Sequence, residues 1–289
     1  KQMSDKMKNL VTRTITGVVF IAVMVGGIVF RPDLFIVLFA TITGLALWEY
    51  TGLANNIERV SINRFISTVA GVYFFLAVAS LQIGLCSGII VFVPYILTIL
   101  YLFISELYLK QQNAINDWAY TMLGQMYITL PFSLINILAF QAENGIPTYD
   151  KLLPLSVFVF LWINDTGAYC TGSLLGRHKL FPRISPAKSW EGSIGGGILV
   201  LCAAALVGYW ANQGANSHVL SIPGWIGLGL TVVIFGTLGD LVESLFKRTL
   251  GIKDSGNMLP GHGGMLDRFD SSLLAIPAAV VYLYSLQLF

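Results

Sequence analysis

The chain has 289 residues, of which 55% are hydrophobic and only 11% are charged, and its mean hydropathy is +0.74. A soluble domain carries about 25% charged residues because its surface faces water. The composition therefore excludes a water-soluble globular protein and predicts a chain whose exterior largely contacts lipid. The formal net charge of +2 says little about partners, and the positions of the charges are more informative. We expect no binding to nucleic acid.

Apolar segments of the length that crosses a bilayer recur along the whole chain. We predict about nine such helices, since a span needs about 20 residues: 14–30, 34–54, 66–82, 88–109, 119–140, 152–171, 193–212, 223–246 and 271–289. The third and fourth are the least clearly separated. The expected fold class is all-α, a polytopic integral membrane protein. Residues 1–150 would form about five N-terminal spans, and residues 151–289 would form C-terminal spans that carry the catalytic site.

The basic residues predict the orientation of these spans. With the N-terminus in the cytoplasm, all Lys and Arg residues except Arg31 and Lys151 fall on the inner side. Cytoplasmic loops carry an excess of Lys and Arg, so this segregation predicts a cytoplasmic N-terminus. The two longest inner loops, 172–192 and 247–270, also hold most of the unusual polar residues. The active face is therefore expected to be cytoplasmic.

One carboxylate interrupts the second apolar segment. Glu49, in the stretch LWEYTGL, lies close to the predicted inner interface. It could pair with a neighbouring helix or contribute to a site, and the sequence leaves both possibilities open.

The first polar region reads NDTGAYCTGSLLGRHKLFPRISPAKSWEGSIGG, residues 164–196. Asp165 and Tyr169 lie one helical turn apart near the inner end of an apolar segment. Small residues at Gly167, Gly172 and Gly176 would let a neighbouring helix or a ligand come close. We interpret Arg177 and Lys179 as determinants of topology and His178 as a surface residue.

The stretch SPAKSWEG ends this region just before the seventh apolar segment. Its candidate substrate-binding residues are Ser185, Lys188, Ser189 and Glu191. Lys188 stands in a turn that leads into a helix N-terminus, where anion binding is favoured. This position favours a functional role for Lys188.

The second polar region runs from residue 239 to residue 271. Its first part places four polar residues at i, i+3, i+4 and i+7, on one helix face: Asp240, Glu243, Ser244 and Lys247. An ionisable residue in hydrocarbon costs at least about 2.5–3.5 kcal/mol on insertion scales, so such a cluster usually marks a site. Lys247 and Arg248 taken alone could equally be interfacial side chains that reach towards water.

A second pair of carboxylates, Asp267 and Asp270, follows in the stretch PGHGGMLDRFD. Two carboxylate pairs at membrane helix ends can converge at one cytoplasmic depth. Hard oxygen ligands beside Lys and Arg are what a Mg²⁺-bound nucleoside triphosphate requires. Gly261, Gly263 and Gly264 would let backbone N–H groups approach phosphate oxygens.

These residues together resemble the signature of the phosphatidate cytidylyltransferase family. The matching positions are Ser244-Leu-Phe-Lys247-Arg248, Lys253-Asp254, Pro260-Gly-His262-Gly-Gly264 and Asp267-Arg268-Phe-Asp270. Upstream, Asp165-x-x-Ala168-Tyr169 and Ser185-Pro186-x-Lys188-Ser189-x-Glu191-Gly192 also resemble the family. The family often has Thr where Ser189 stands, a difference that keeps the hydroxyl. The motifs cover residues 164–271, whereas the first 150 residues resemble the family in hydropathy alone.

The resemblance implies transfer of CMP from CTP to phosphatidic acid, which gives CDP-diacylglycerol and pyrophosphate for phospholipid biosynthesis. It further implies Mg²⁺ dependence, with a monovalent cation such as K⁺ as a second candidate ion. The expected location is the inner (plasma) membrane, with a cytoplasmic site, membrane lipids as partners and a homodimeric assembly.

On this hypothesis the polar residues take distinct roles. Asp240 and Asp267 are the principal metal ligands, and Asp270 and Glu243 are further ligands or their supports. The candidates for holding phosphate groups are Lys188, Lys247, Arg248, Lys253 and Arg268. His262 would donate to a phosphate or orient Asp267, while Asp165 and Tyr169 would order the basic loop or recognise CTP. The remaining substrate-binding candidates are Ser185, Ser189, Glu191, Ser244, Asp254, Gly263 and Gly264.

Two other classes of function compete with this hypothesis. A transporter or channel could use Asp165, Asp240 and Glu243 as a cation relay. The polar residues gather at helix ends rather than at mid-membrane, and no inverted repeat is visible, which favours an enzyme. Another membrane phosphotransferase, such as a CTP-dependent lipid kinase or a prenyl-phosphate sugar-phosphate transferase, would differ in its products.

Overall fold

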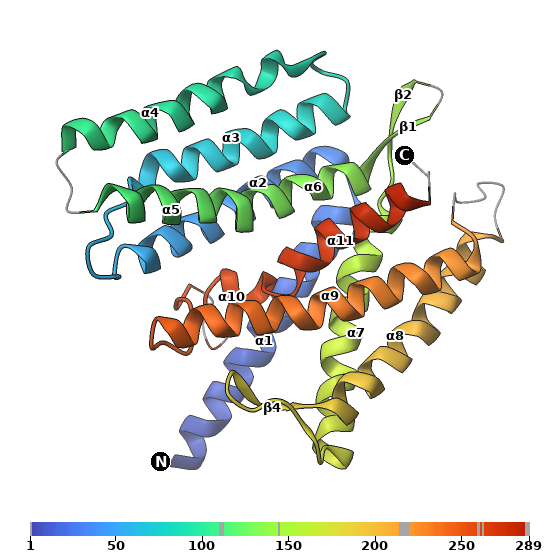
Figure 1. Ribbon diagram of the computed structural model, residues 1–289. Coiled ribbons are helices and arrows are strands. Elements are labelled where there is room, and N and C mark those ends of the chain that lie inside the picture. Colours follow the sequence, from blue (N-terminus) through green and yellow to red (C-terminus); the bar gives the residue numbers. More distant parts are fainter. Residues whose placement is uncertain are drawn as a thin grey trace. The chain divides into compact units, whose positions relative to one another are not determined.

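In the computed structural model the chain is mostly helical (Figure 1). The structure describes residues 2–109, 113–143, 145–213, 220–258, 261 and 263–286. A helix satisfies its backbone hydrogen bonds internally, which hydrocarbon requires of any spanning segment. The all-α expectation holds except for two short antiparallel hairpins at helix ends. These pair β1 (Phe140–Glu143) with β2 (Ile146–Tyr149), and β3 (Lys179–Phe181) with β4 (Ser185–Ser189).

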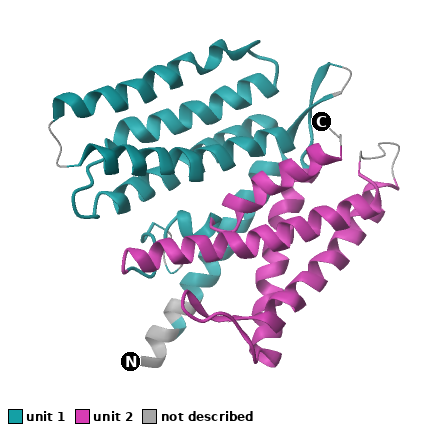
Figure 2. Ribbon diagram, viewed as in Figure 1, with its two compact units in different colours: residues 1–151, 252–269 teal, residues 152–251, 270–289 magenta. Residues whose placement is uncertain are grey.

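Unit 1 combines the N-terminal helices with a segment from much later in the chain, since it comprises residues 1–151 and 252–269 (Figure 2). Its longer helices are α1 (Gln2–Val29), α2 (Pro32–Ala54), α3 (Arg64–Gln82), α4 (Val93–Leu109), α5 (Ala114–Gly124) and α6 (Leu130–Ala139). Three shorter elements are the 3₁₀ turn η1 (Ile89–Phe92), the π-helical turn η2 (Gln125–Thr129) and α10 (Leu266–Phe269). The segment 252–269 thus groups with the first helices, a grouping that the predicted division into residues 1–150 and 151–289 does not include.

A buried polar contact joins η2 to α3 in unit 1, and a second one supports it from within η2. The Gln125 side-chain amide donates to the Ser67 carbonyl at 2.9 Å, and the Thr129 hydroxyl donates to Gln125 Oε1 at 3.2 Å. All three residues are buried. Such pairing is needed because an unsatisfied amide in hydrocarbon costs several kcal/mol.

Unit 2 comprises residues 152–251 and 270–289. It contains β3, β4 and the helices α7 (Leu152–Leu175), α8 (Trp190–Ala211), α9 (Ile222–Thr249) and α11 (Ser272–Ser285). Glycines bring α7 and α8 close together: a Cβ on Gly167 would lie 2.9 Å from the Gly196 Cα, and one on Gly196 would lie 2.6 Å from the Asn164 carbonyl oxygen. The predicted close approach at Gly167 is therefore confirmed, and it fits the use of small residues at membrane helix interfaces.

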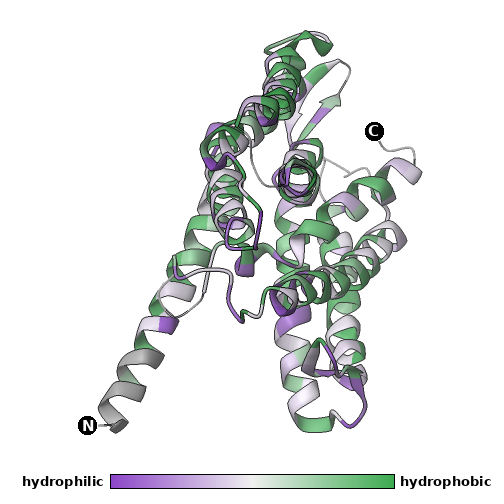
Figure 3. Cartoon of the chain, turned by 60° about the vertical axis from the view of Figure 1, so that its left-hand side comes forward, coloured by the Kyte–Doolittle hydropathy of each residue, from purple (hydrophilic) through white to green (hydrophobic). Residues whose placement is uncertain are grey.

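Eight helical stretches of the described residues are long and apolar enough to cross a membrane. They are Val11–Val29, Pro32–Ala54, Arg64–Gln82, Ile89–Leu109, Ala114–Ala139, Leu152–Leu175, Trp190–Ala211 and Ile222–Thr249. Apolar residues cover most of their length (Figure 3). On α4, the side chains of Ile96, Leu100 and Leu107 are half or more exposed, as expected of surfaces that face lipid.

The ninth predicted segment overlaps α11, whose 14 described residues are fewer than the about 20 that a straight span needs. Among the described helices, eight of the predicted spans are thus confirmed as candidates. The ninth span and the cytoplasmic N-terminus stay predictions.

Candidate functional site

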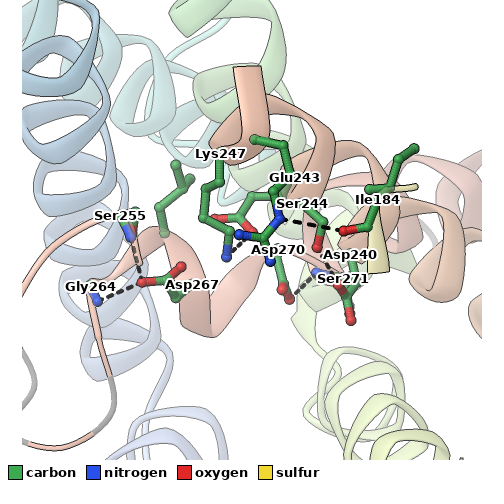
Figure 4. A network of polar contacts seen from close by, with 12 residues as sticks. Ile184, Asp240, Glu243, Ser244, Lys247, Ser255, Gly264, Asp267, Asp270 and Ser271 are labelled. Carbon is green, nitrogen blue, oxygen red and sulfur yellow. Dashed lines mark hydrogen bonds and ion pairs between the residues drawn. The ribbon is translucent and has the colours of Figure 1, made fainter. Parts of the chain in front are cut away.

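The C-terminal part of α9 carries the polar face that its sequence spacing predicts (Figure 4). The Ser244 hydroxyl donates to Asp240 Oδ1 at 3.2 Å, one turn away. On the next turn, Lys247 Nζ lies 2.6 Å from Glu243 Oε2, and the Glu243 side chain is fully buried. A carboxylate this buried must be paired with a positive charge. Both contacts span four residues, so the predicted shared face is confirmed.

Lys188 connects the first polar region to this helix end. It lies on β4, and its Nζ is 2.5 Å from Asp240 Oδ2. Both side chains are about one-quarter exposed, which leaves the pair accessible from solvent. The structure therefore brings together two of the sequence-predicted site residues that lie far apart in the chain.

A pocket of about 250 Å³ opens around this ion pair in unit 2. Its walls come from α7, β4, the start of α8 and α9: Asn164, Asp165, Ala168, Tyr169, Ala187, Lys188, Ser189, Gly192, Ser193, Thr237 and Asp240. Small-molecule sites usually measure about 300–1,000 Å³, so this pocket is slightly smaller than that range. Its size suits one phosphate-bearing group better than two complete substrates.

The β3–β4 hairpin is held by a carboxylate that the sequence assigns to substrate binding. Glu191 Oε2 accepts from the Arg177 N–H at 3.1 Å, and Glu191 Oε1 lies 2.6 Å from His178 Nδ1. Ser189 caps α8 by accepting from the Gly192 N–H at 3.1 Å. Glu191 and Ser189 therefore shape the hairpin that carries Lys188, and their contact with substrate stays a prediction. His178 is exposed, as expected, but it is paired rather than isolated.

Arg248 also contacts the hairpin. Its Nε donates to the Ile184 carbonyl at 3.5 Å, and Ser185 begins β4 directly after that residue. Tyr169, by contrast, is 77% exposed at the pocket wall, so its ring is open to a ligand.

Asp270 adds a further carboxylate to unit 2, in the turn before α11. Its Oδ1 accepts from the Ser271 N–H at 2.5 Å. Burial raises the pKa of the Asp270 carboxyl well above its ordinary value. Three carboxylates of the same unit raise that pKa further: Asp240, Glu243 and Asp165. Like charges gathered in this way favour a cation.

The donor chemistry of this carboxylate group fits a hard divalent ion such as Mg²⁺. Among the described residues, however, no three His, Cys, Asp or Glu side chains already surround one point. Asp240 and Glu243 are each paired with a lysine instead. An ion would therefore have to replace or share these lysine contacts.

The other predicted carboxylate, Asp267, lies in the 252–269 segment of unit 1. Its Oδ2 accepts from the Ser255 N–H and from the Gly264 N–H, both at 2.8 Å (Figure 4). A Cβ on Gly263, where φ is +81°, would lie 2.6 Å from the same oxygen. Gly264 N–H thus has a partner within the chain, and a role for these glycines in phosphate binding stays a prediction.

Glu49 is a residue whose role the sequence left open. Its carboxylate is buried, and it accepts from the Met265 N–H at 2.8 Å, from the Leu266 N–H at 3.2 Å and from the Ser255 hydroxyl. Glu49 therefore binds the same segment that carries Asp267. A carboxylate inside an apolar span was the one sequence feature that could have indicated it.

The remaining predicted residues have simpler placements. Lys253, Asp254 and Arg268 are exposed in the 252–269 segment. His262 lies outside the described residues. The expected meeting of Asp240 with Asp267 stays a prediction, since the two residues belong to different units.

Comparison with known proteins assigns the chain to a family. The family model described as "Cytidylyltransferase family" matches residues 11–286. The chain is 33% identical over 278 residues to the phosphatidate cytidylyltransferase of Haemophilus influenzae, an alignment that covers 92% of this chain and 95% of that protein. It is 35% identical over 271 residues to the phosphatidate cytidylyltransferase of Staphylococcus aureus, with the same two coverages. The chain belongs to the cytidylyltransferase family.

Proposed function

We propose that this protein transfers CMP from CTP to phosphatidic acid and so produces CDP-diacylglycerol and pyrophosphate. Family membership and the names of the relatives support this reaction. The single structural observation that supports it best is the accessible Lys188–Asp240 pair in the wall of the unit 2 pocket. A cation and a carboxylate at one opening can bind a phosphate group and its counter-ion together.

The proposed CMP transfer depends on charge stabilisation more than on proton transfer. A phosphatidate oxygen, already anionic, would attack the α-phosphorus of CTP, and the bond from that phosphorus to the bridging oxygen would break to release pyrophosphate. Catalysis then depends on holding two polyanions together and on stabilising the charge on the leaving group. The basic side chains of the site supply this, and a general base is not required.

Within unit 2, the contacts of the basic residues support a distinct proposed role for each of them. Lys188 would release Asp240 and bind a phosphate oxygen in the pocket, while Lys247 would neutralise the buried Glu243. Tyr169 and Asp165, on the pocket wall, would contact the substrate held there. Lys253 and Arg268, exposed on the segment of unit 1, are proposed as further phosphate-binding residues. Ser185 and Asp254 remain proposed substrate contacts.

We further propose a Mg²⁺ requirement, with Asp240 and Asp270 as ligands in unit 2, Glu243 as their support and Asp267 as a ligand from unit 1. Bound Mg²⁺ would neutralise charge on the triphosphate and on the departing pyrophosphate. A monovalent cation such as K⁺ is a second candidate. The repulsion that raises the pKa of Asp270 supports a cation at this place.

Added Mg²⁺ is expected to raise the melting temperature of the purified protein in detergent, because it relieves repulsion among these carboxylates. A ligand at about 100 times its dissociation constant stabilises the folded state by about 2.7 kcal/mol. In Asp270→Asn, which removes one proposed ligand and a buried ionisable group beside Asp240, Glu243 and Asp165, the melting temperature without Mg²⁺ should rise and the Mg²⁺-induced increase should shrink. Thermal unfolding at matched ionic strength measures both effects. An unchanged Mg²⁺ response in the variant would contradict the assignment of Asp270.

The proposed location is the inner (plasma) membrane, with the site on the cytoplasmic face and the acyl chains of the substrate in lipid. The apolar surfaces of the helices and the segregation of basic residues support this placement. A homodimer is proposed from the resemblance to the family.

Pyrophosphate release by the purified protein in mixed micelles tests the proposed function. We expect release only when CTP and phosphatidic acid are both present, and we expect EDTA to stop it. A transporter would release none. Release from CTP alone would identify a nucleotide hydrolase and contradict the proposal.

A further inference from the structure

The segment 252–269 is fixed to the helices of unit 1 by two different kinds of contact. At its polar side, Glu49 on α2 accepts hydrogen bonds from the backbone of Met265 and Leu266. At its apolar side, the buried ring of Phe269 lies edge-on to Phe20 and Phe132, with ring centroids 5.8 and 5.5 Å away. Edge-on aromatic pairs contribute to packing beyond the area they bury. The segment therefore takes its position from the first helices of the chain.

Ser255 joins Glu49 to the predicted metal ligand Asp267. The Ser255 hydroxyl donates to Glu49 Oε1, while the Ser255 N–H donates to Asp267 Oδ2 at 2.8 Å. Gly264 N–H donates to the same Asp267 oxygen, immediately before the two backbone groups that bind Glu49. Any movement of Glu49 would therefore be transmitted to Asp267 through Ser255 and residues 264–266.

Two glycines pack closely against the Glu49 carboxylate. A Cβ on Gly264 would lie 1.9 Å from Glu49 Oε1, and one on Gly256 would lie 2.8 Å from Glu49 Oε2. The side chain is only 8% exposed. Three donors converge on it, and an ionised carboxylate offers only acceptor sites to such donors. A glutamine would instead turn an N–H₂ group towards at least one of them.

We propose that Glu49 is a positioning residue for CMP transfer, which sets the place and orientation of Asp267 through Ser255 and residues 264–266. This inference rests on the proposed function. It adds a residue from the second helix to a site whose other candidates all lie beyond residue 160. Groups that orient a metal ligand typically affect metal affinity or activity by about 10–100-fold when they are replaced.

Glu49→Gln tests this inference with three measurements. In metal-free protein, the amides of residues 255 and 264–266 should exchange with deuterium faster than in the wild type. In CMP-transfer assays, kcat should fall by about 10-fold or more and the Mg²⁺ concentration for half-maximal rate should rise. The KM for CTP should change by less than about twofold, because Glu49 acts through Asp267 rather than on the nucleotide.

Asp117→Asn is the matched control. Asp117 is a carboxylate of the same unit, 2% exposed, and it accepts from the Ser61 N–H at 2.6 Å. The substitution should lower the free energy of unfolding without altering the Mg²⁺ dependence of the rate or the deuterium exchange of the amides of residues 255 and 264–266. Should Glu49→Gln fail to fold, Ser255→Ala removes only the hydroxyl link and should give the same changes at smaller size.

Two results would overturn the inference. The first is a Glu49→Gln variant whose Mg²⁺ dependence and deuterium exchange equal those of the wild type. The second is an Asp117→Asn variant whose Mg²⁺ dependence and deuterium exchange change as much as those of Glu49→Gln. A wild-type protein that makes no CDP-diacylglycerol would instead overturn the proposed function, and the exchange comparison alone would then decide whether Glu49 fixes the segment.

Discussion

Replacement of Asp240 by Asn is expected to lower CMP transfer at least about 100-fold, the size of effect seen when a preorganised electrostatic group is removed. Asn has nearly the same shape but no charge. Lys188 would lose the carboxylate that lies 2.5 Å from its Nζ, and the proposed Mg²⁺ would lose a ligand. Because Asp240 is about one-quarter exposed, the variant should still fold. Steady-state kinetics in phosphatidic acid micelles measure the loss.

Asp33→Asn provides the comparison for this experiment. Asp33 is an exposed carboxylate that pairs with Arg31 at 2.9 Å, so it resembles Asp240 in chemistry but lies outside the proposed site. Its replacement should leave turnover unchanged. Turnover of Asp240→Asn within about threefold of the wild type would refute the role of Asp240.

Gly264→Ala is expected to have the second largest effect. The new Cβ would lie 1.9 Å from Glu49 Oε1 and 2.4 Å from the Ser255 Oγ, so the segment that holds Asp267 must move. Overpacking of this kind typically costs about 1–3 kcal/mol in the free energy of unfolding. We expect a lower melting temperature together with a loss of CMP transfer of at least about tenfold. Thermal unfolding and the micelle assay report the two effects separately.

Gly26→Ala controls for the loss of a glycine as such. A Cβ there would meet the Phe30 ring at 3.6 Å, an ordinary contact, and α1 would gain a better helix former. Melting temperature and activity should stay at or above wild-type values. If Gly264→Ala also kept the melting temperature and activity of the wild type, the tight packing around Glu49 would not be needed for stability or for activity.

The helices and the polar face of α9 could be predicted from the sequence because both depend on local spacing. Apolar length predicts a span, and residues four apart meet on a helix, as Ser244 does with Asp240. The shortness of α11 and the two hairpins did not follow from hydropathy. A strand of three to five residues leaves no periodic pattern long enough to recognise.

The partners of the predicted residues could not be obtained from local sequence. The turn that contains Lys188 predicts anion binding, but the pairing of Lys188 with Asp240 depends on how β4 and α9 fold together. The sequence predicts that the glycines beside His262 bind phosphate through their backbone N–H groups. In the structure, Gly263 and Gly264 make room for the Asp267 and Glu49 carboxylates. Contacts between distant parts of the chain decide such roles, and hydropathy and motif spacing do not encode them.

The position of the label transferred from CTP tests the proposed reaction most directly. Purified protein would be incubated with phosphatidic acid and Mg²⁺, and with CTP that carries ³²P at either the α or the γ phosphate. Transfer of CMP predicts that the α label enters the lipid fraction and that the γ label leaves in pyrophosphate. A lipid carrying the γ label would identify a kinase, and a lipid carrying neither would mean that this protein does not transfer any part of CTP to phosphatidic acid.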